Sequence, residues 1–255
     1  MKKQILTLAA GFMVITFISC NKEVPQAPGG RLQENENNTS VNSVPSNNTL
    51  VNVTTTSKAD PLTNGLEGWF EFDKNLKDNT GKLHDASATI RNPLYTTDRK
   101  GHANAALKLD STYFVRIANV VQQTHSSVSV WVKYGNVVPF CPFIRSNDAG
   151  IVISQQNFRW TEGVYIPGIG TQAAYSRDTY NGWHHIVATY DGGEIKLYID
   201  ASYVVPVTWV GSYGPVYANY IVGSGINEYW RGYVDDLRFY SRTLSAADVQ
   251  ALHDL

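Results

Sequence analysis

The sequence predicts an all-β domain, a two-sheet antiparallel sandwich or jelly roll with one short helix at the C-terminus. From residue 66 onward, short runs rich in Val, Ile, Tyr and Trp alternate with turn residues, the pattern of strands joined by tight turns. Several runs alternate apolar and polar residues, as half-buried strands do. A helical pattern is visible only close to the C-terminus. Many short strands and one terminal helix favour a sandwich.

The expected strands fill most of the chain after residue 66. In the clearest of them, Val128, Val130 and Val132 share one face and polar or larger residues occupy the other. The expected strands are 67–72, 105–109, 113–117, 127–134, 140–145, 150–154, 158–161, 184–190, 194–200, 203–207, 219–223 and 231–240.

Local signals mark one hairpin and one helix. The Asp-Gly-Gly sequence at residues 191–193 lies between two expected strands and predicts a tight turn. Near the C-terminus, Ser245 and Asp248 have the spacing of a capping box, and Val249 and Leu252 give the following helix one apolar face.

The N-terminus has the features of an export signal. Lys2 and Lys3 precede an apolar stretch at 5–18 that is too short for a comfortable transmembrane helix. It ends in Ile-Ser-Cys at residue 20, which resembles the lipobox of bacterial lipoproteins. The resemblance implies cleavage before Cys20 and lipidation of its thiol, which would anchor the chain stably. An ordinary signal peptide and an uncleaved anchor are the alternatives.

Residues 21–60 read as a disordered tether. They are rich in Asn, Ser and Thr, contain no aromatic residue and show no apolar periodicity. We therefore expect a signal peptide at 1–20, a tether at 21–60 and a folded domain at 61–255. Asn21 follows the lipobox cysteine, where Asp is associated with retention in the inner membrane. The expected location is the bacterial cell envelope, at the outer membrane or cell surface.

Charge and cysteine content narrow the function classes. The formal net charge is −1 and only 17% of residues are charged, with no basic stripe, so nucleic acid is not an expected partner. The two cysteines are Cys20 and Cys141. Lipidation of the first leaves no disulfide framework, and Cys141 is expected to be a small buried residue.

Three segments together resemble the laminin-G-like, concanavalin A-like family. The first is Gly-Trp-Phe-Glu-Phe-Asp at 68–73 with the Asp-containing loop at 76–81, in which Thr replaces the usual Ser. The second is Trp-His-His and its hairpin at 183–200, and the third is the terminal strand and turn at 232–245. The resemblance covers the chain from about residue 64 to its end. It implies a concanavalin A-like jelly roll.

The catalytic signature of the family's glucanases, Glu-x-Asp-x-Glu on one strand, does not occur in the sequence. Asp235 and Asp236 are adjacent, so a regular strand would point them to opposite faces. For the same reason His184 and His185 should not bind one metal ion, and we interpret them as structural. We name no catalytic residue, and a carboxylate pair from distant strands stays an alternative.

The resemblance also implies a structural calcium ion. Calcium prefers carboxylate and carbonyl oxygens. Carried over by position, the carboxylates are Asp78 and Asp235, with backbone carbonyls near Lys82 and His84 as further ligands. The alternative is that Asp78 makes an Asx turn and that Asp235 pairs with Arg242.

Five residues are candidate ligand contacts, because aromatic rings stack on sugar rings while polar neighbours bind hydroxyl groups. They are Arg159, Trp160, Tyr175, Trp209 and Tyr213. Ordinary packing is the alternative for each.

The function that fits best is a surface-anchored lipoprotein with a non-catalytic binding domain for a glycan or matrix polymer. It would touch the membrane only through its lipid anchor. A glycoside hydrolase or lyase and a protein–protein accessory subunit of a surface complex are the two alternatives. Fold alone does not choose among the three.

Overall fold

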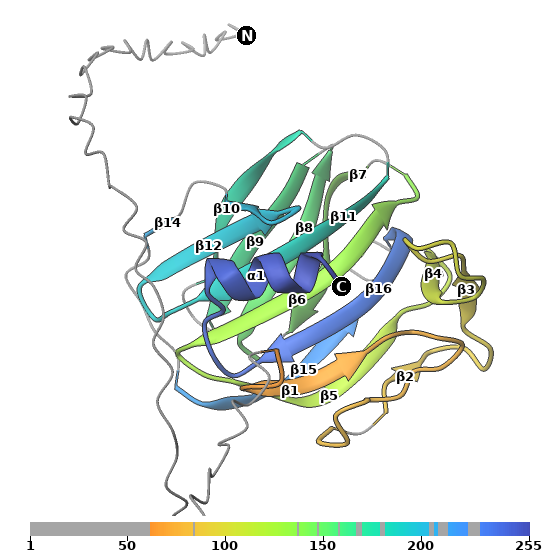
Figure 1. Ribbon diagram of the computed structural model, residues 1–255, viewed down its shortest axis with the longest axis horizontal. Helices are drawn as coiled ribbons and strands as arrows, with labels where there is room; N and C mark the ends of the chain where they lie inside the picture. The colour runs from red at the N-terminus through yellow and green to blue at the C-terminus, as the bar shows by residue number, and fades with distance from the viewer. Residues whose placement is uncertain are drawn as a thin grey trace, which may run out of the picture. The chain divides into compact units, whose positions relative to one another are not determined.

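Two antiparallel sheets lie face to face in the computed structural model, and one short helix lies outside them (Figure 1). The described residues are 62–83, 85–136, 138–146, 148–157, 159–166, 170–178, 182–203, 207–208, 214–223 and 230–255. This architecture confirms the predicted all-β sandwich with a C-terminal helix. The predicted signal peptide, Cys20 and the tether lie outside the described residues.

The larger sheet has nine strands in the described part of the chain, ordered β13-β12-β11-β6-β16-β4-β3, with β1 on β16 and β14 on β12. Its strands are β1 (Leu66–Phe70), β3 (Leu94–Thr96), β4 (Ala106–Asp110), β6 (Ser126–Tyr134), β11 (Trp183–Tyr190), β12 (Glu194–Ile199), β13 (Ser202–Tyr203), β14 (Val207–Thr208) and β16 (Arg231–Tyr240).

The smaller sheet has seven described strands, ordered β10-β9-β8-β7-β15-β5-β2. They are β2 (Ser87–Ala88), β5 (Val115–Gln122), β7 (Val138–Ser146), β8 (Gly150–Asn157), β9 (Arg159–Ile166), β10 (Gly170–Asp178) and β15 (Val216–Val222). The sequence patterns missed β2, β3 and β10, which lack a run of alternating apolar residues.

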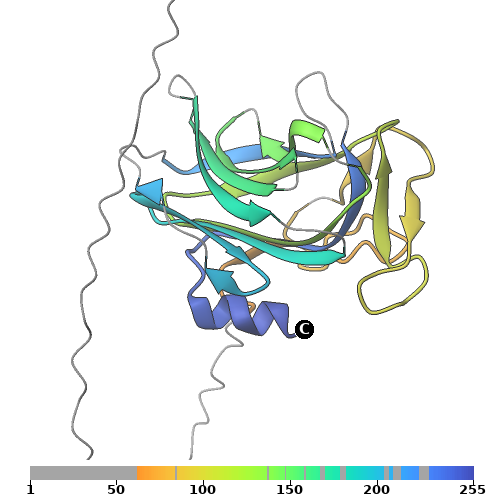
Figure 2. The same ribbon diagram turned by 90° about the horizontal axis from the view of Figure 1, so that it is seen from above.

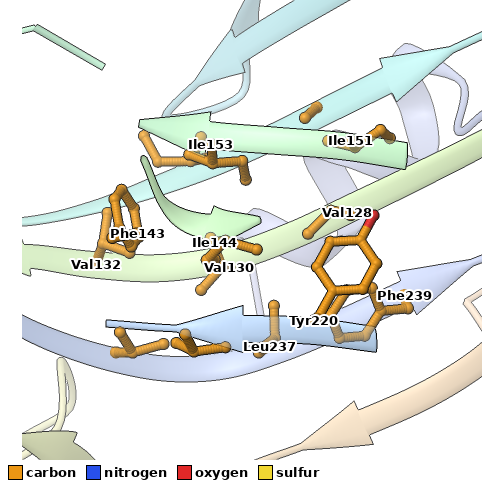
Figure 3. Close-up of a cluster of buried hydrophobic side chains, with 14 of the residues drawn as sticks. Val128, Val130, Val132, Phe143, Ile144, Ile151, Ile153, Tyr220, Leu237 and Phe239 are labelled. Carbon is orange, nitrogen blue, oxygen red and sulfur yellow. The ribbon is translucent and has the colours of Figure 1, made fainter. Parts of the chain in front are cut away.

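The main core lies between the two sheets. Val128, Val130 and Val132 of β6 are fully buried, as their alternation predicted. Figure 3 shows them facing side chains of the opposite sheet, including Ile151 and Ile153. Full burial of such a side chain contributes about 1.5–3 kcal/mol. Cys141 is also completely buried, as expected.

Helix α1 (Ala246–His253) covers part of the outer face of the nine-stranded sheet (Figure 2). Its predicted capping box is present, because Ser245 Oγ accepts from the amide of Asp248, whose carboxylate accepts from the amide of Ser245. Val249 and Leu252 are buried against this face. No helix in the described part of the chain has the length and apolar character needed to cross a membrane.

Two leucines give a matched test of the core. Leu237 of β16 is completely buried and Leu94 of β3 is 38% exposed. We expect Leu237→Ala to lower the free energy of unfolding by about 2–5 kcal/mol, because it leaves a cavity in the core. Leu94→Ala should lower it by only about 0.5 kcal/mol. Urea unfolding measures both, and equal losses would contradict the assigned core.

Candidate functional site

A cavity of about 700 Å³ opens on the outer face of the nine-stranded sheet, beside β1 and β16. We call it the charged pocket and define it by the lining residues Trp69, Arg99, Asp235, Asp236 and Arg238. Further polar and apolar side chains complete the lining: Leu62, Thr63, Leu66, Glu71, Asp73, Asn79, Thr80, Lys82, Asp98, Lys100, His102 and Leu255.

A β-bulge in β16 brings two carboxylates into this pocket. The pairing of β16 with β6 changes register between Asp235 and Arg238, and Asp236 has a left-handed φ of 47°. The two adjacent aspartates therefore reach the same guanidinium. Asp235 Oδ2 lies 2.5 Å from Nη1 of Arg99, and Asp236 Oδ2 lies 3.6 Å from Nη2. The expectation that they point to opposite faces is wrong, because it assumed a regular strand.

Arg99 comes from the loop before β4, which Asp98 holds in shape. One carboxylate oxygen of Asp98 accepts from the amides of Lys100 and His102, and the other contacts the imidazole of His102 at 2.9 Å. The Arg99 side chain is 12% exposed, and its guanidinium lies 4.8 Å from the ring centre of Trp131. The guanidinium is thus fixed by two carboxylates and an aromatic face.

Asp236 also fixes the indole ring of Trp69, which lines the pocket. Its Oδ1 accepts from the indole N–H of Trp69 at 2.6 Å and from Nε of Arg238 at 2.9 Å. The guanidinium of Arg238 stacks on Trp69, 4.4 Å from the ring centre. Cations and carboxylates therefore alternate through the network, which keeps the buried charges paired.

Burial raises the pKa of Asp235 to about 7, with Asp236 adding to the effect and Arg99 opposing it. The pKa of Arg238 is raised above its ordinary value, because the carboxylate of Asp236 outweighs the lowering effect of burial. The carboxylates of Asp235 and Asp236 and the guanidinium groups of Arg99 and Arg238 stabilise one another, since any of these charges would be costly to bury alone.

Asp78 makes the Asx turn that was the alternative to calcium binding. Its Oδ1 accepts from the amides of Trp69 and Thr80, and its Oδ2 accepts from the Thr80 hydroxyl and the Leu83 amide. Burial opposes ionisation, but these hydrogen bonds hold the pKa of Asp78 below its ordinary value. The other half of that alternative, a pair of Asp235 with Arg242, is wrong, because Arg242 pairs with Asp248 at 2.8 Å and Asp235 pairs with Arg99.

The described side chains do not fit a calcium ion at Asp78 and Asp235. Four donors already point at the carboxylate of Asp78, and the Arg99 guanidinium takes the place of a cation at Asp235. No group of three or more His, Cys, Asp or Glu side chains within the described ranges is arranged to hold a metal ion. His84 lies outside those ranges, so the predicted calcium ion is not tested there, and the occupied carboxylates lead us to expect none at Asp78 and Asp235.

The two adjacent histidines have separate partners, as expected. His184 Nδ1 contacts Asp200 at 2.8 Å, and His185 Nε2 contacts the hydroxyl of Ser129 at 2.8 Å. Burial lowers the pKa of His185 to about 3, which keeps its ring neutral.

The predicted ligand contacts are not brought together in the charged pocket. Trp160 is completely buried and stacks on Tyr134 at 4.4 Å, so its role as a surface contact is corrected. Arg159 and Tyr175 occupy positions in β9 and β10, while Trp209 and Tyr213 lie outside the described residues.

Sequence reasoning missed most of the pocket. Trp69 stands in the sequence only as part of the family motif at 68–73, and Arg99 lies in a loop without a motif. The Asp-Asp pair at 235–236 was the one signal that could have pointed to it.

Calcium dependence can be measured directly. We expect thermal melts of the protein in excess calcium and in excess EDTA to superimpose, because an ion that binds only the native state must raise its midpoint. A midpoint that rises with calcium would restore the predicted ion and require ligands other than the described carboxylate pair.

Comparisons with known proteins agree with the fold. Domain 4 of AbnA, a GH43 extracellular arabinanase from Geobacillus stearothermophilus, solved with arabinotriose, matches with a TM-score of 0.61 and 21% identity over 74% of this chain and 98% of that domain. The receptor-binding domain of botulinum neurotoxin D matches with a TM-score of 0.62 and 17% identity over 76% of this chain and 53% of the toxin domain. Likenesses at this identity show the fold alone.

A third solved structure is the botulinum neurotoxin serotype D ligand-binding domain with N-acetylneuraminic acid, with a TM-score of 0.59 and 16% identity over 74% of this chain and 50% of that one. The chain thus spans about half the length of the toxin domains. No curated protein sequence matches the chain. The family model of the concanavalin A-like lectin/glucanases superfamily matches residues 109–250. The chain therefore belongs to the concanavalin A-like lectin/glucanase superfamily, as the resemblance of its three sequence segments indicated.

Proposed function

We propose that the chain is a surface lipoprotein, anchored through Cys20, whose folded domain binds a glycan in the charged pocket without catalysis. The observation that carries the proposal is the combination of a fixed aromatic ring with converging polar groups in one cavity of about 700 Å³. Ligand sites are typically concave, with a few fixed polar groups that set orientation.

The pocket chemistry suits a sugar. Trp69 is half-buried, and its ring is held by Asp236 and Arg238, so it offers a surface that loses little freedom when a ligand binds. Asn79 and Thr80 line the same cavity, and their side chains can bind hydroxyl groups.

Solved neighbours give the proposal its ligand class. One is an arabinanase domain in complex with arabinotriose, and another is a toxin domain in complex with N-acetylneuraminic acid. A further toxin domain was solved with rat synaptotagmin II, a protein, which keeps a protein ligand as the alternative outcome.

Binding is favoured over hydrolysis by the state of the two aspartates. A glycoside hydrolase uses one carboxyl group as an acid and the other as a nucleophile or base. Here the side chains of Asp235 and Asp236 are only 5% and 10% exposed, and both contact Arg99. Neither carboxylate is free to meet a glycosidic bond.

A glycan screen of the purified chain tests the proposal, followed by calorimetry with the best oligosaccharide. Trp69→Ala should weaken binding by about tenfold or more, equivalent to about 1.4 kcal/mol, because it removes the stacking surface. Trp69→Phe keeps a ring and should lose less. The control is Trp183→Ala, at a half-buried tryptophan that does not line the pocket.

Three outcomes would count against the proposal. Release of reducing ends from a bound polysaccharide would indicate a hydrolase, and an empty glycan screen would favour a protein partner. Equal losses of oligosaccharide affinity in the Trp69 and Trp183 variants would show that the charged pocket is not the binding site. The anchor is tested separately, because Cys20→Ser should move the chain out of the membrane fraction.

A further inference from the structure

Helix α1 covers a histidine on the outer face of the nine-stranded sheet (Figure 1). His185 of β11 pairs with Trp131 of β6, and its side chain points outward because the next residue, Ile186, belongs to the core between the sheets. His185 is nevertheless only 1% exposed. His253, the last residue of α1, places its ring 5.9 Å from that of His185, and both rings stack on Trp131.

The site around His185 accommodates a neutral imidazole better than a charged one. Nε2 of His185 lies 2.8 Å from the hydroxyl of Ser129, whereas Nδ1 has no hydrogen-bond partner among the described residues. A protonated imidazole has two N–H donors, so one of them would be buried here without an acceptor. A buried donor without an acceptor costs free energy, and more so when it carries charge. The geometry therefore favours the uncharged ring while α1 stays in place.

The two carboxylates whose charge reaches His185 are bound to other groups. One oxygen of Asp200 accepts from the backbone amide of His185, and the other contacts the ring of His184. Asp236 accepts from the guanidinium of Arg238 and pairs with other pocket residues. Neither carboxylate has a printed contact with the His185 ring, so neither replaces the missing acceptor at Nδ1.

The cations near His185 oppose a second positive charge. Burial lowers the pKa of His185 to about 3, and both His253 and Arg99 add to this effect, while Asp236 and Asp200 oppose it. His253 itself contacts the carboxylate of Asp254 at 3.3 Å.

Helix α1 can leave this face without breaking a strand pairing. It lies outside both sheets (Figure 2) and is held by the buried side chains of Val249 and Leu252 and by the ion pair of Arg242 with Asp248 at 2.8 Å. Short elements at the end of a domain open locally at less cost than central strands. Once α1 has moved away, His185 meets water and gains a proton near its ordinary pKa of about 6.5.

We propose that helix α1 is an acid-released cover of the nine-stranded sheet, with His185 as the residue that senses the proton. Acid favours the undocked helix, in which the ring of His185 is charged and hydrated. Leu255, which follows α1, lines the charged pocket, and Trp131 contacts Arg99 of the same pocket, so release also changes the pocket. Only this consequence for a ligand rests on the glycan function proposed above.

The docked helix is favoured at high pH. The undocked state binds a proton that the docked state excludes, so docking is most stable above pH 6.5 and weakens as the pH falls toward 3. Each pH unit within this window should raise the ratio of undocked to docked helix about tenfold. The Asp248 carboxylate of α1 has its pKa lowered to about 2, chiefly by Arg242, so its contribution is lost mainly below pH 4.

Hydrogen exchange of the full chain, without ligand, measures the release. Exchange of the amides at 246–253, divided by the intrinsic rate at each pH, should rise about tenfold from pH 6 to pH 5 and about tenfold again to pH 4. His185→Gln keeps a polar side chain that takes no proton, so exchange of α1 should stay flat over this range. The matched control is His184→Gln, at the neighbouring histidine with a carboxylate partner, which should keep the rise.

Three outcomes would overturn the proposal. They are exchange of α1 that does not rise between pH 6 and pH 4, an undiminished rise in His185→Gln, and an equal rise in β6 and β11, which would indicate unfolding of the whole domain. If His185→Gln does not fold, His185→Asn takes its place, with circular dichroism at pH 7 as the check on both variants. Because no ligand is present, failure of this proposal is distinct from failure of the glycan screen.

Discussion

The bulge in β16 is the constraint on which the outer face of the nine-stranded sheet depends. A left-handed backbone at Asp236 places two consecutive carboxylates on one side of a central strand. Two buried negative charges would be too costly without partners. Arg99 and Arg238 supply the partners, and through Asp236 they also fix the indole of Trp69. One irregular residue thus determines the charge, shape and rigidity of the pocket.

The rest of the fold stabilises β16 despite the bulge at Asp236. β16 pairs with β6, β4 and β1, and its residues Leu237 and Phe239 are completely buried between the sheets. The two outer faces are used differently. Helix α1 covers part of one and leaves the pocket beside it, whereas the described strands of the smaller sheet have no helix over them (Figure 2). The charged pocket therefore lies on the face that helix α1 covers only in part.

The sequence predicted features that short stretches of chain determine. The alternation in β6, the capping box at Ser245 and the Asx turn at Asp78 each involve neighbours within a few residues, and each is present. The pocket depends on contacts between distant residues, such as Arg99 with Asp235, 136 positions apart. No local pattern encodes that pairing or the backbone conformation of Asp236. Trp160 was misinterpreted for a related reason, since its burial comes from packing against other strands.

A double-mutant cycle on Arg99→Ala and Asp235→Asn tests most directly whether the bulge builds a coupled charge network. Each single change should destabilise the fold by leaving a buried charge without its partner. The two losses in unfolding free energy should not be additive, with a coupling of about 1–3 kcal/mol in urea unfolding. Losses that add to within about 0.5 kcal/mol would contradict it, because the two side chains would then act independently.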